Sequence, residues 1–507
     1  MNLLDNLLLG FQTAFSLVNL TYCFFGVTIG TFIGVLPGIG PLAAVAVLMP
    51  VTFYMDPTAA LVMIAGIYYG AEYGGSTASI LLNLPGTASN AVTCLDGYPM
   101  AKQGRAGVAL FTTTMTSFIG GSLGILLLIL FAPKIADFAL SFRATEYVAV
   151  MLLGLIAAAV VTQGSAFKGL IMVAFGLILG TVGVDLDSGV PRYTMGIFEL
   201  RDGISIVIIA TGLFGISEMI FAIHGGRAAG SVQPVKLRSM LPTSKDLAAS
   251  GGPALRGAAI GSMIGALPGT GVTLAAFMSY ALEKRIARDP SRFGKGAIEG
   301  IAGPESANNA AAQTAFIPTL SLGIPGSPTM ALLLGAMMIH GIAPGPLLMT
   351  ERPDMFWGLV ASFWIGNVLL LILNIPLIGV WVRILRIPYR FLYLGILPLI
   401  CVGVFSLRGS YVDVGLVLGV GIFGYFLRLL HFEPAPLLIA FVLGPMLEEN
   451  FRRAMALGRG DLLYFFQDPL GSVLLISTGL ILLLAVAAPA FRWMRHKKPE
   501  RPGFGSS

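Results

Sequence analysis

The sequence predicts an all-α polytopic membrane protein with about 12 transmembrane segments, some of them broken or re-entrant. The 507-residue chain is 56% hydrophobic and only 11% charged, whereas soluble domains carry about 25% charged residues. Apolar runs of about 20 residues recur along the chain, which is the length that crosses a hydrocarbon core of roughly 30 Å. These runs are continuous rather than alternating, which favours helices over an outer-membrane barrel.

Lysine and arginine in the short loops predict the orientation, because cytoplasmic loops carry an excess of both. The basic loops, which we expect on the cytoplasmic side, are 102–105, 224–256 and 283–295. The loops with more acids than bases, which we expect outside, are 185–202, 350–354 and 448–468. The apolar runs that fit this alternation are 107–131, 146–162, 169–184, 203–223, 356–381, 391–407, 410–431, 434–447 and 470–490.

Two segments interrupt apolar runs in the same chemical style. They are "NLPGTAS" (83–89) and "GIPGSPT" (323–329). Proline removes a backbone donor and clashes with the preceding turn of a helix. A break in lipid leaves several backbone groups unpaired, at several kcal/mol each, so such breaks persist where they line a cavity. The alternative is that both prolines are kinks packed against neighbouring helices.

Matching motifs in the same order predict an internal duplication. "IGVLPGIG" (33–40) resembles "IGALPGTG" (264–271), and each is followed by a polar cluster and then by one of the two breaks. The loop charges place both ends of the hairpin 26–55 outside and both ends of the hairpin 257–282 inside. This arrangement predicts an inverted-topology repeat, in which broken helices meet near the membrane midplane.

The repeat predicts the division of the chain. The predicted first half is 1–223, with broken hairpins 26–55 and 58–101, and a cytoplasmic linker, 224–256, follows it. The predicted second half is 257–490, with hairpin 257–282 and broken segment 296–349. The remaining residues, 491–507, are predicted to form a basic, disordered, cytoplasmic tail. The N-terminal run 3–22 fits either a surface helix or a span.

Polar residues in and before the two breaks are the candidate substrate ligands. In the first half they are Ser76, Thr77, Asn83, Pro85, Gly86, Thr87, Ser89 and Asn90, and in the second half Asn308, Asn309, Thr314, Pro325, Gly326, Ser327 and Thr329. We expect Thr87, Ser89 or Asn90 to cap the helix after the first break, and Ser327 or Thr329 the helix after the second. Helix N-termini suit an anion, and neither cluster contains Lys or Arg. Hydrogen bonding between helices is the alternative role.

Two intramembrane acids and the glycine loops are the candidate ion-coupling residues. Glu72 and Glu305 are predicted to occupy matching repeat positions, and an acid inside a membrane is a functional hypothesis by default. Three roles stay open for them: carrying protons, coordinating Na⁺, or accepting backbone N–H bonds at the broken helices. Carbonyl groups at the breaks would supply further cation ligands, and the glycine-loop candidates are Gly38, Gly40, Gly269, Thr270 and Gly271.

We expect no catalytic residues, no cofactor and no metal ion apart from Na⁺ as a coupling ion. Cys23, Cys94 and Cys401 form no metal-binding or disulfide pattern. The chain lacks an HExxH zinc motif, a Walker A loop and a convincing nucleophile–base set, which argues against an enzyme. The net charge of +6 is explained by the basic loops without a nucleic-acid partner.

The longest motifs resemble a known family. "GVLPGIGP", "GAEYGGSTASILLNLPGTASNAVTCLDGYPMAKQGRAG", "GALPGTG" and "GPESANNAAAQTAFIPTLSLGIPGSPTMALLLGA" closely resemble the large membrane subunit of the tripartite tricarboxylate transporters, over nearly the whole chain. The resemblance implies a bacterial inner-membrane secondary transporter of about a dozen spans. It also implies a small membrane subunit of about four spans, a periplasmic protein that delivers citrate or a similar carboxylate, and uptake driven by Na⁺ or H⁺.

The residues and the resemblance predict the same mechanism, alternating access of one carboxylate site. We expect the two hairpins and their polar clusters to move the substrate across a scaffold of the other helices, in an elevator-like rather than a rocking motion. The rival interpretations are a passive channel for carboxylates or other anions and, less favoured, an integral-membrane enzyme.

Overall fold

The computed structural model describes residues 2–161, 165–185, 187–224, 235, 237–269, 271–385 and 389–496. These residues form a helical protein. Within them the single sheet is an antiparallel pair of two-residue strands, β1 (Gly183–Val184) and β2 (Pro191–Arg192), in which Gly183 pairs with Arg192. The predicted all-α fold class is therefore confirmed.

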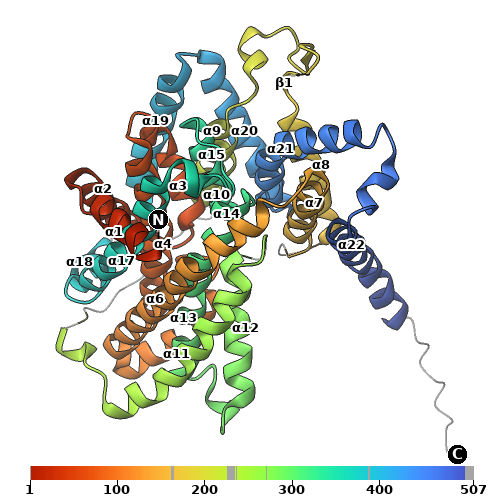
Figure 1. Cartoon of the computed structure of the whole chain (residues 1–507). Coiled ribbons are helices and arrows are strands. Elements are labelled where there is room, and N and C mark those ends of the chain that lie inside the picture. The colour runs from red at the N-terminus through yellow and green to blue at the C-terminus, as the bar shows by residue number, and fades with distance from the viewer. Residues whose placement is uncertain are drawn as a thin grey trace, which may run out of the picture.

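The helices follow one another along the whole chain (Figure 1). The α-helices are α1 (Leu3–Ala14), α2 (Leu17–Val35), α3 (Gly40–Thr52), α4 (Pro57–Leu82), α5 (Ala91–Met100), α6 (Ala106–Ala139), α7 (Ala144–Val161), α8 (Ala166–Gly180), α9 (Ile206–Ala210), α10 (Ser217–His224), α11 (Ser244–Gly265), α12 (Gly271–Ile286), α13 (Glu299–Thr314), α14 (Phe316–Leu322), α15 (Pro328–Ile339), α16 (Leu348–Glu351), α17 (Pro353–Asn374), α18 (Ile378–Ile384), α19 (Tyr389–Arg408), α20 (Tyr411–Leu429), α21 (Ala435–Leu457) and α22 (Pro469–His496). The short 3₁₀ and π segments are η1 (Ala101–Arg105), η2 (Phe198–Asp202), η3 (Thr211–Ile216), η4 (Leu237–Met240), η5 (Pro290–Arg292) and η6 (Leu462–Phe466).

Six helical stretches of the described residues are long and apolar enough to cross a bilayer. They are Leu17–Val35, Ala91–Ala139, Ala144–Val161, Pro353–Asn374, Tyr411–Leu429 and Pro469–Ala487. Shorter apolar helices accompany them, among them α3, α8 and α15. The protein is therefore a multi-pass membrane protein, and part of its membrane domain is built from helices too short to span alone.

Several helix bounds differ from the predicted segments. The first hairpin begins at Leu17 rather than at 26, because Ser16 Oγ caps α2 by accepting the backbone N–H of Asn19 at 3.3 Å. Helix α11 begins at Ser244, inside the segment predicted as a linker. A reciprocal capping box between Thr243 and Asp246 starts it there. The tail beyond 496 and most of 225–236 lie outside the described residues, and the division into inverted halves stays a prediction.

Glycines at every fourth position bring the backbones of α2 and α4 together. A Cβ atom added to Gly26, Gly30 or Gly34 would lie 2.6, 2.5 or 2.2 Å from the carbonyl oxygen of Met63, Ile67 or Ala71, in that order. No residue except glycine fits at such distances. Small residues at helix interfaces allow this close approach in membranes, where lipid supplies no hydrophobic force between helices.

The same stripe recurs where α11 packs on α13. An added Cβ at Gly257, Gly261 or Gly265 would lie 2.1, 2.0 or 2.4 Å from the carbonyl oxygen of Gly303, Ala307 or Ala311, in that order. In both helix pairs, α2 with α4 and α11 with α13, the contacting residues therefore recur at every fourth position on each helix. We call these residues the glycine stripes, α2/α4 and α11/α13.

The glycine stripes correct the predicted equivalence of the two glutamates. Gly34 contacts Ala71, and its counterpart in the repeated motif, Gly265, contacts Ala311. Glu72 follows Ala71, so its counterpart is Ala312 and not Glu305. The two glutamates are therefore at different heights on their helices. The predicted match was wrong because the order of motifs along the chain does not fix the positions at which the helices contact each other.

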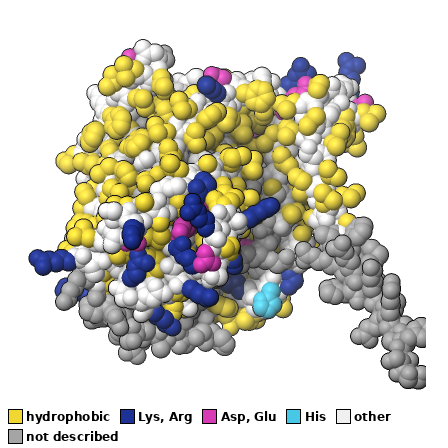
Figure 2. Space-filling model, turned by 90° about the horizontal axis from the view of Figure 1, so that it is seen from below, with side chains coloured by type: hydrophobic (Ala, Val, Ile, Leu, Met, Phe, Trp, Pro, Cys, Tyr) yellow, Lys and Arg dark blue, Asp and Glu magenta, His cyan; other side chains and the backbone are white. Residues whose placement is uncertain are grey.

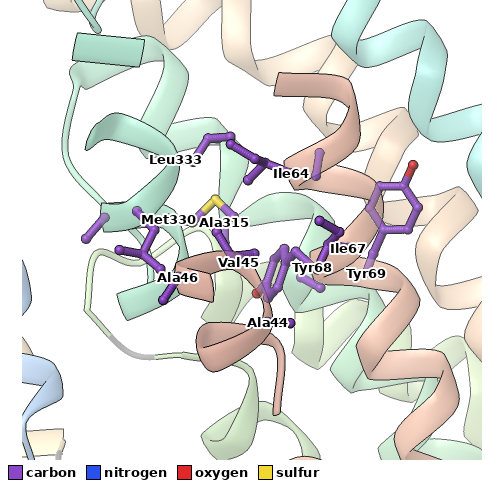
Figure 3. Close-up of a cluster of buried hydrophobic side chains, with 14 of the residues drawn as sticks. Ala44, Val45, Ala46, Ile64, Ile67, Tyr68, Tyr69, Ala315, Met330 and Leu333 are labelled. Carbon is purple, nitrogen blue, oxygen red and sulfur yellow. The ribbon is translucent and has the colours of Figure 1, made fainter. Parts of the chain in front are cut away.

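A buried apolar cluster joins α3, α4 and α15. Figure 3 shows Ile64, Ile67 and Tyr68 of α4 facing Ala44–Ala46 of α3 and Met330 and Leu333 of α15, whereas Tyr69 points away. All of these side chains are almost completely buried. This cluster fixes the short helices α3 and α15, one from each half, against the long helix α4.

Basic side chains gather at one end of the molecule. The lower ends of α11 and α12 reach this end in Figure 1, and both helices carry basic residues in or beside their terminal turns, Lys245, Lys284 and Arg285. Figure 2 looks at the molecule from this side and shows many more Lys and Arg than Asp and Glu side chains. This distribution is typical of a cytoplasmic face, and the orientation itself stays a prediction.

An ionic cluster ties the segment around β1 and β2 to α21. Arg452 donates to Asp185 at 2.6 Å, to Asp187 at 2.7 Å and to Glu448 at 2.6 Å, and Arg192 contacts Glu448 at 2.7 Å. The hydrogen bond from Arg452, helped by the backbone N–H of Ser188, lowers the pKa of Asp185. Arg192 lowers the pKa of Glu448 in the same way.

We predict that Gly261→Ala destabilises the protein, because the new methyl group would lie 2.0 Å from the Ala307 carbonyl oxygen. Overpacking of this kind costs about 1–3 kcal/mol, and thermal unfolding in detergent would measure it. Gly419→Ala on α20 is the matched control, because nothing lies within 4 Å of its added Cβ. Equal melting temperatures for the two variants would contradict the close packing of α11 on α13.

We predict that Arg452→Met lowers stability at neutral pH and that its difference from wild type shrinks in acid. Carboxylates with a lowered folded-state pKa stabilise the protein above their unfolded pKa of about 4. That stabilisation is lost as the pH falls through the folded-state pKa. Melting temperatures between neutral and acidic pH would measure the effect. The neighbouring Arg453→Met is the control, since its pair with Glu449 is exposed and such pairs contribute little.

Candidate functional site

One cavity of about 640 Å³ is lined by both breaks and by both glycine loops. The first break contributes 85–89, the second 327–329, and the loops contribute 38–41 and 271–273. A further wall comes from η3 and α10 and from the residues that join α20 to α21. The volume is typical of a site for a small molecule.

Four helices begin at this cavity. The first residues of α3 (Gly40), α12 (Gly271), α15 (Pro328) and α21 (Ala435) all line it. Each helix N-terminus presents unpaired backbone N–H groups and the positive end of a helix dipole. Four such ends around one cavity make it a favourable place for an anion.

The two glycine loops have the same backbone conformation. Gly38 and Gly40 have φ angles of +88° and +66°, and Gly269 and Gly271 have +77° and +68°. Residues with side chains rarely adopt these left-handed conformations. The repeated Leu-Pro-Gly-x-Gly sequence therefore builds the same turn twice, and each turn starts a helix whose N-terminus faces the cavity.

The first break turns back against α2 and α4. Asn83 ends α4 in a left-handed conformation, with φ of +57°. A Cβ atom added to Gly86 would lie 2.1 Å from the Gly34 carbonyl oxygen and 2.4 Å from Gly75 Cα. The glycine is therefore required for the chain to fold back, and this return places Thr87 and Ser89 beside Glu72.

Thr87 and Ser89 bind Glu72 instead of capping α5. Ser89 Oγ lies 2.6 Å and Thr87 Oγ1 3.1 Å from Glu72 Oε2. Asn90 is the N-cap residue of α5, but its side chain forms no capping bond. The predicted capping is therefore wrong at this break, because these hydroxyl groups contact the buried carboxyl group of Glu72 on α4 instead.

Glu305 receives side-chain donors from two other helices. Its carboxylate accepts Asn90 Nδ2 at 2.9 Å, the Thr93 hydroxyl group and, at 3.4 Å, the Ser117 hydroxyl group of α6. Both glutamates are 1% exposed. Their carboxylates bond to side chains, and no backbone N–H donates to either among the described residues. The predicted role as acceptors of backbone N–H groups is therefore wrong.

The second break has the same left-handed backbone conformation at its start as the first, but the helix after it is capped by a side chain. Gly323, at the position of Asn83, also adopts a left-handed conformation, with φ of +70°. Gly326 N–H donates to Thr319 Oγ1 at 3.3 Å, which pairs one freed backbone group. Ser327 Oγ accepts the N–H of Met330 at 3.3 Å and caps α15, as predicted. Thr329 lies in the first turn of α15 and is not the cap.

The structure brings part of the predicted set to the cavity. The predicted residues that line it are Gly38, Gly40, Glu72, Pro85, Gly86, Thr87, Ser89, Gly271, Ser327 and Thr329. Those that do not line it are Ser76, Thr77, Asn83, Asn90, Gly269, Glu305, Asn308, Asn309, Thr314, Pro325 and Gly326. Thr270 lies outside the described residues. Asn83 is exposed, whereas Asn308 and Asn309 are buried behind the wall.

Sequence reasoning missed a basic residue in the cavity wall. Arg428, near the end of α20, lines the cavity together with Glu218 of α10, and the two form an ion pair. The guanidinium carbon also lies 6.0 Å from the centre of the Phe221 ring. Arg428 follows the apolar stretch 414–427, and a basic residue inside a membrane segment marks a functional site. That signal was missed because Arg428 was counted within the apolar run 410–431.

Broken helices that meet at a cavity lined by apolar and charged side chains inside a multi-pass protein are typical of a membrane transport protein. The chain belongs to the tripartite tricarboxylate transporter TctA family, whose pattern it matches over residues 20–439. It is similar to the uncharacterized 52.8 kDa protein in the TAR-I ttuC' 3' region of Agrobacterium vitis, with 49% identity over 98% of this chain and 99% of that protein. It is also similar to an uncharacterized protein in the TAR-II ttuC' 3' region of the same organism, with 52% identity over 46% of this chain and 97% of that protein.

The family confirms the resemblance found in the motifs. The chain is the large membrane subunit of a tripartite transporter. Such a transporter has membrane and binding-protein partners.

Proposed function

We propose that this subunit imports citrate or a related di- or tricarboxylate by symport with Na⁺ or H⁺. It works in the bacterial inner membrane, with its C-terminus in the cytoplasm, together with a small four-span subunit and a periplasmic solute-binding protein. The observation that carries the proposal is the cavity of about 640 Å³ at which four helix N-termini and Arg428 converge.

The donors around the cavity suit a molecule with several carboxylate groups. The N-termini of α3, α12, α15 and α21 come from both halves of the chain, so separate anionic groups would find separate donors. Ser89 and Thr329 add hydroxyl groups to the wall. Arg428 has the planar fork that binds a carboxylate through two hydrogen bonds. Because Arg428 forms an ion pair with Glu218 in this structure, a substrate carboxylate would replace Glu218 as its partner.

Import of an anion requires a driving force. A potential that is negative inside opposes each negative charge by about 2.3 kcal/mol per 100 mV. A di- or tricarboxylate would therefore have to enter with enough cations to cancel or reverse its charge. Glu72 in the cavity wall gives the protein a group that binds such a cation.

Alternating access would carry the filled cavity across the membrane. The α2/α4 and α11/α13 glycine stripes hold each broken hairpin against its neighbour at backbone contact. Each pair would therefore move as a unit, with the first break attached to α4 and the second leading from α13. We favour an elevator-like movement of these units against the remaining helices.

We predict gradient-driven accumulation of a carboxylate in proteoliposomes that contain the large subunit, its small partner and the binding protein. A panel of labelled di- and tricarboxylates, with and without a Na⁺ or pH gradient, would identify substrate and coupling ion. Accumulation that requires both the gradient and the binding protein is the expected result. Downhill flux alone would establish a passive channel instead, and no flux of any carboxylate would overturn the proposed substrate class.

We predict that Arg428→Gln weakens binding of the transported carboxylate at least tenfold and that Arg428→Lys weakens it less. Lysine keeps the charge but loses the planar pair of donors. Truncating one partner of a desolvated charge pair costs about 2–5 kcal/mol, so affinity would fall at least tenfold. Binding measured by calorimetry in detergent would detect the loss. Arg453→Gln, on the exposed face of α21, is the control, and unchanged affinity in Arg428→Gln would contradict the assignment.

A further inference from the structure

A line of short contacts joins Glu72 to Glu305 through three side chains. Glu72 Oε2 lies 2.6 Å from Ser89 Oγ, and Ser89 Oγ lies 2.7 Å from Thr87 Oγ1. Thr87 Oγ1 lies 2.6 Å from Asn90 Oδ1, and Asn90 Nδ2 lies 2.9 Å from Glu305 Oε1. Every contact has hydrogen-bond length, so each requires one hydrogen between its two atoms.

The three bridging side chains supply one hydrogen too few. Asn90 gives one hydrogen to Glu305, and its carbonyl oxygen Oδ1 can only accept, so Thr87 must donate to Asn90. Ser89 then has a single hydrogen for two contacts, the one with Thr87 and the one with Glu72. If both glutamates were ionised, one of these contacts would bring two acceptors together without a hydrogen.

A proton on Glu72 completes the line. Protonated Glu72 donates to Ser89, Ser89 donates to Thr87, Thr87 donates to Asn90, and Asn90 donates to Glu305. All four short contacts then hold one hydrogen each. Only the longer contact between Thr87 and Glu72, 3.1 Å, is left without one. Glu305 is ionised at the end of the line, where the hydroxyl groups of Thr93 and Ser117 also donate to it.

Turning the Asn90 amide by 180° moves the required proton but does not remove it. Amide oxygen and nitrogen are assigned from the hydrogen-bond network, so both orientations have to be counted. In the turned form Asn90 donates to Thr87, Thr87 to Ser89 and Ser89 to Glu72, which is then ionised. Asn90 Oδ1 now faces Glu305 Oε1, and Glu305 must carry the hydrogen. Either orientation therefore places one proton on the pair.

The surroundings provide no positive charge that would replace the proton. Neither glutamate forms an ion pair within the described part of the chain, and both are 1% exposed. The ionisable groups that act on them are Tyr68, Tyr73 and Cys94, and those sharing the cavity wall are Glu218, Arg428, His431 and Glu433. Arg428 is paired with Glu218. Two ionised carboxylates at this depth would be costly.

A second, independent observation lies beside Glu72. The amide of Asn308 on α13 approaches the Glu72 carboxyl group. It is 1% exposed, and neither its nitrogen nor its oxygen has a short hydrogen bond. A buried amide without a short hydrogen bond is costly, and the Glu72 carboxyl group is the neighbour that Asn308 reaches through a longer hydrogen bond.

We infer that Glu72 and Glu305 form a proton-binding pair that holds one proton between them and exchanges it with the substrate cavity through Glu72. The use of this proton as the coupling ion rests on the proposed function, whereas its presence does not. Glu72 lines the cavity and Glu305 does not, so release to the cavity occurs from Glu72. Release leaves one contact of the line without a hydrogen, and this loosens the first break from α4.

Infrared difference spectroscopy of the purified complex at neutral pH tests the pair directly. The wild type is expected to show the carbonyl band of one protonated, buried carboxyl group. Glu72→Gln should remove the whole band, because the glutamine amide donates to Ser89 and Glu305 is then ionised. Glu305→Gln should also remove it, because its amide donates to Asn90 Oδ1 in the turned orientation and Glu72 is then ionised. Glu283→Gln is the matched control and should leave the band unchanged, since Glu283 is buried but paired with Arg256 at 2.6 Å.

Three results would overturn the inference. They are no such band in the wild type, half of the band left in each single variant, or loss of the wild-type band when Na⁺ replaces choline. The first and third need only the wild type, so they decide the matter even if a variant fails to fold. Labelled-citrate uptake, or uptake of another panel carboxylate, should lose its response to a pH gradient in both single variants. If no carboxylate is transported at all, the proposed function fails while the infrared test still stands.

Discussion

Direct backbone contact along the two glycine stripes is the constraint on which the rest of the structure depends. A helix broken inside a membrane leaves backbone donors and acceptors that lipid cannot satisfy. In this protein the broken segments lie against neighbouring backbone and side chains instead. Gly34 contacts Ala71 and also leaves room for Gly86 of the first break, while Gly265 contacts Ala311. These contacts hold the breaks and the glycine loops in place, and α3, α12 and α15 begin from them at the cavity.

The cavity combines a field that favours anions with acids that bind cations. The helix N-termini and Arg428 attract a carboxylate, whereas Glu72, Glu218 and Glu433 lie in the same wall. The Arg428–Glu218 pair neutralises the guanidinium group, and in the proposed function a substrate carboxylate would replace Glu218. In the proposed function such a site would hold an anion and its counter-charge together, as movement of a di- or tricarboxylate through a low-dielectric layer requires.

Much of the fold could be predicted from the sequence because length and apolar composition decide which helices enter a membrane. The breaks were found because Pro and Gly interrupt helices for local reasons. Tertiary partners could not be predicted: Thr87 and Ser89 turn to Glu72 rather than to the start of α5. Arg428 lines the cavity from α20, a helix that carries none of the repeated sequence motifs, so the motifs could not point to it. The counterpart of Glu72 was misassigned because helix contacts, and not similar letters, define equivalent positions.

The most direct test of the shared cavity is protection of single cysteines from alkylation, with Cys23, Cys94 and Cys401 replaced. Ala88→Cys in the first break and Thr273→Cys at the start of α12 line the cavity from the two halves. A transported carboxylate should slow the alkylation of both. Leu84→Cys, which is exposed but outside the cavity lining, should react at the same rate with and without the carboxylate. Equal rates at Ala88→Cys and Thr273→Cys, with and without substrate, would show that the two halves do not enclose one carboxylate site.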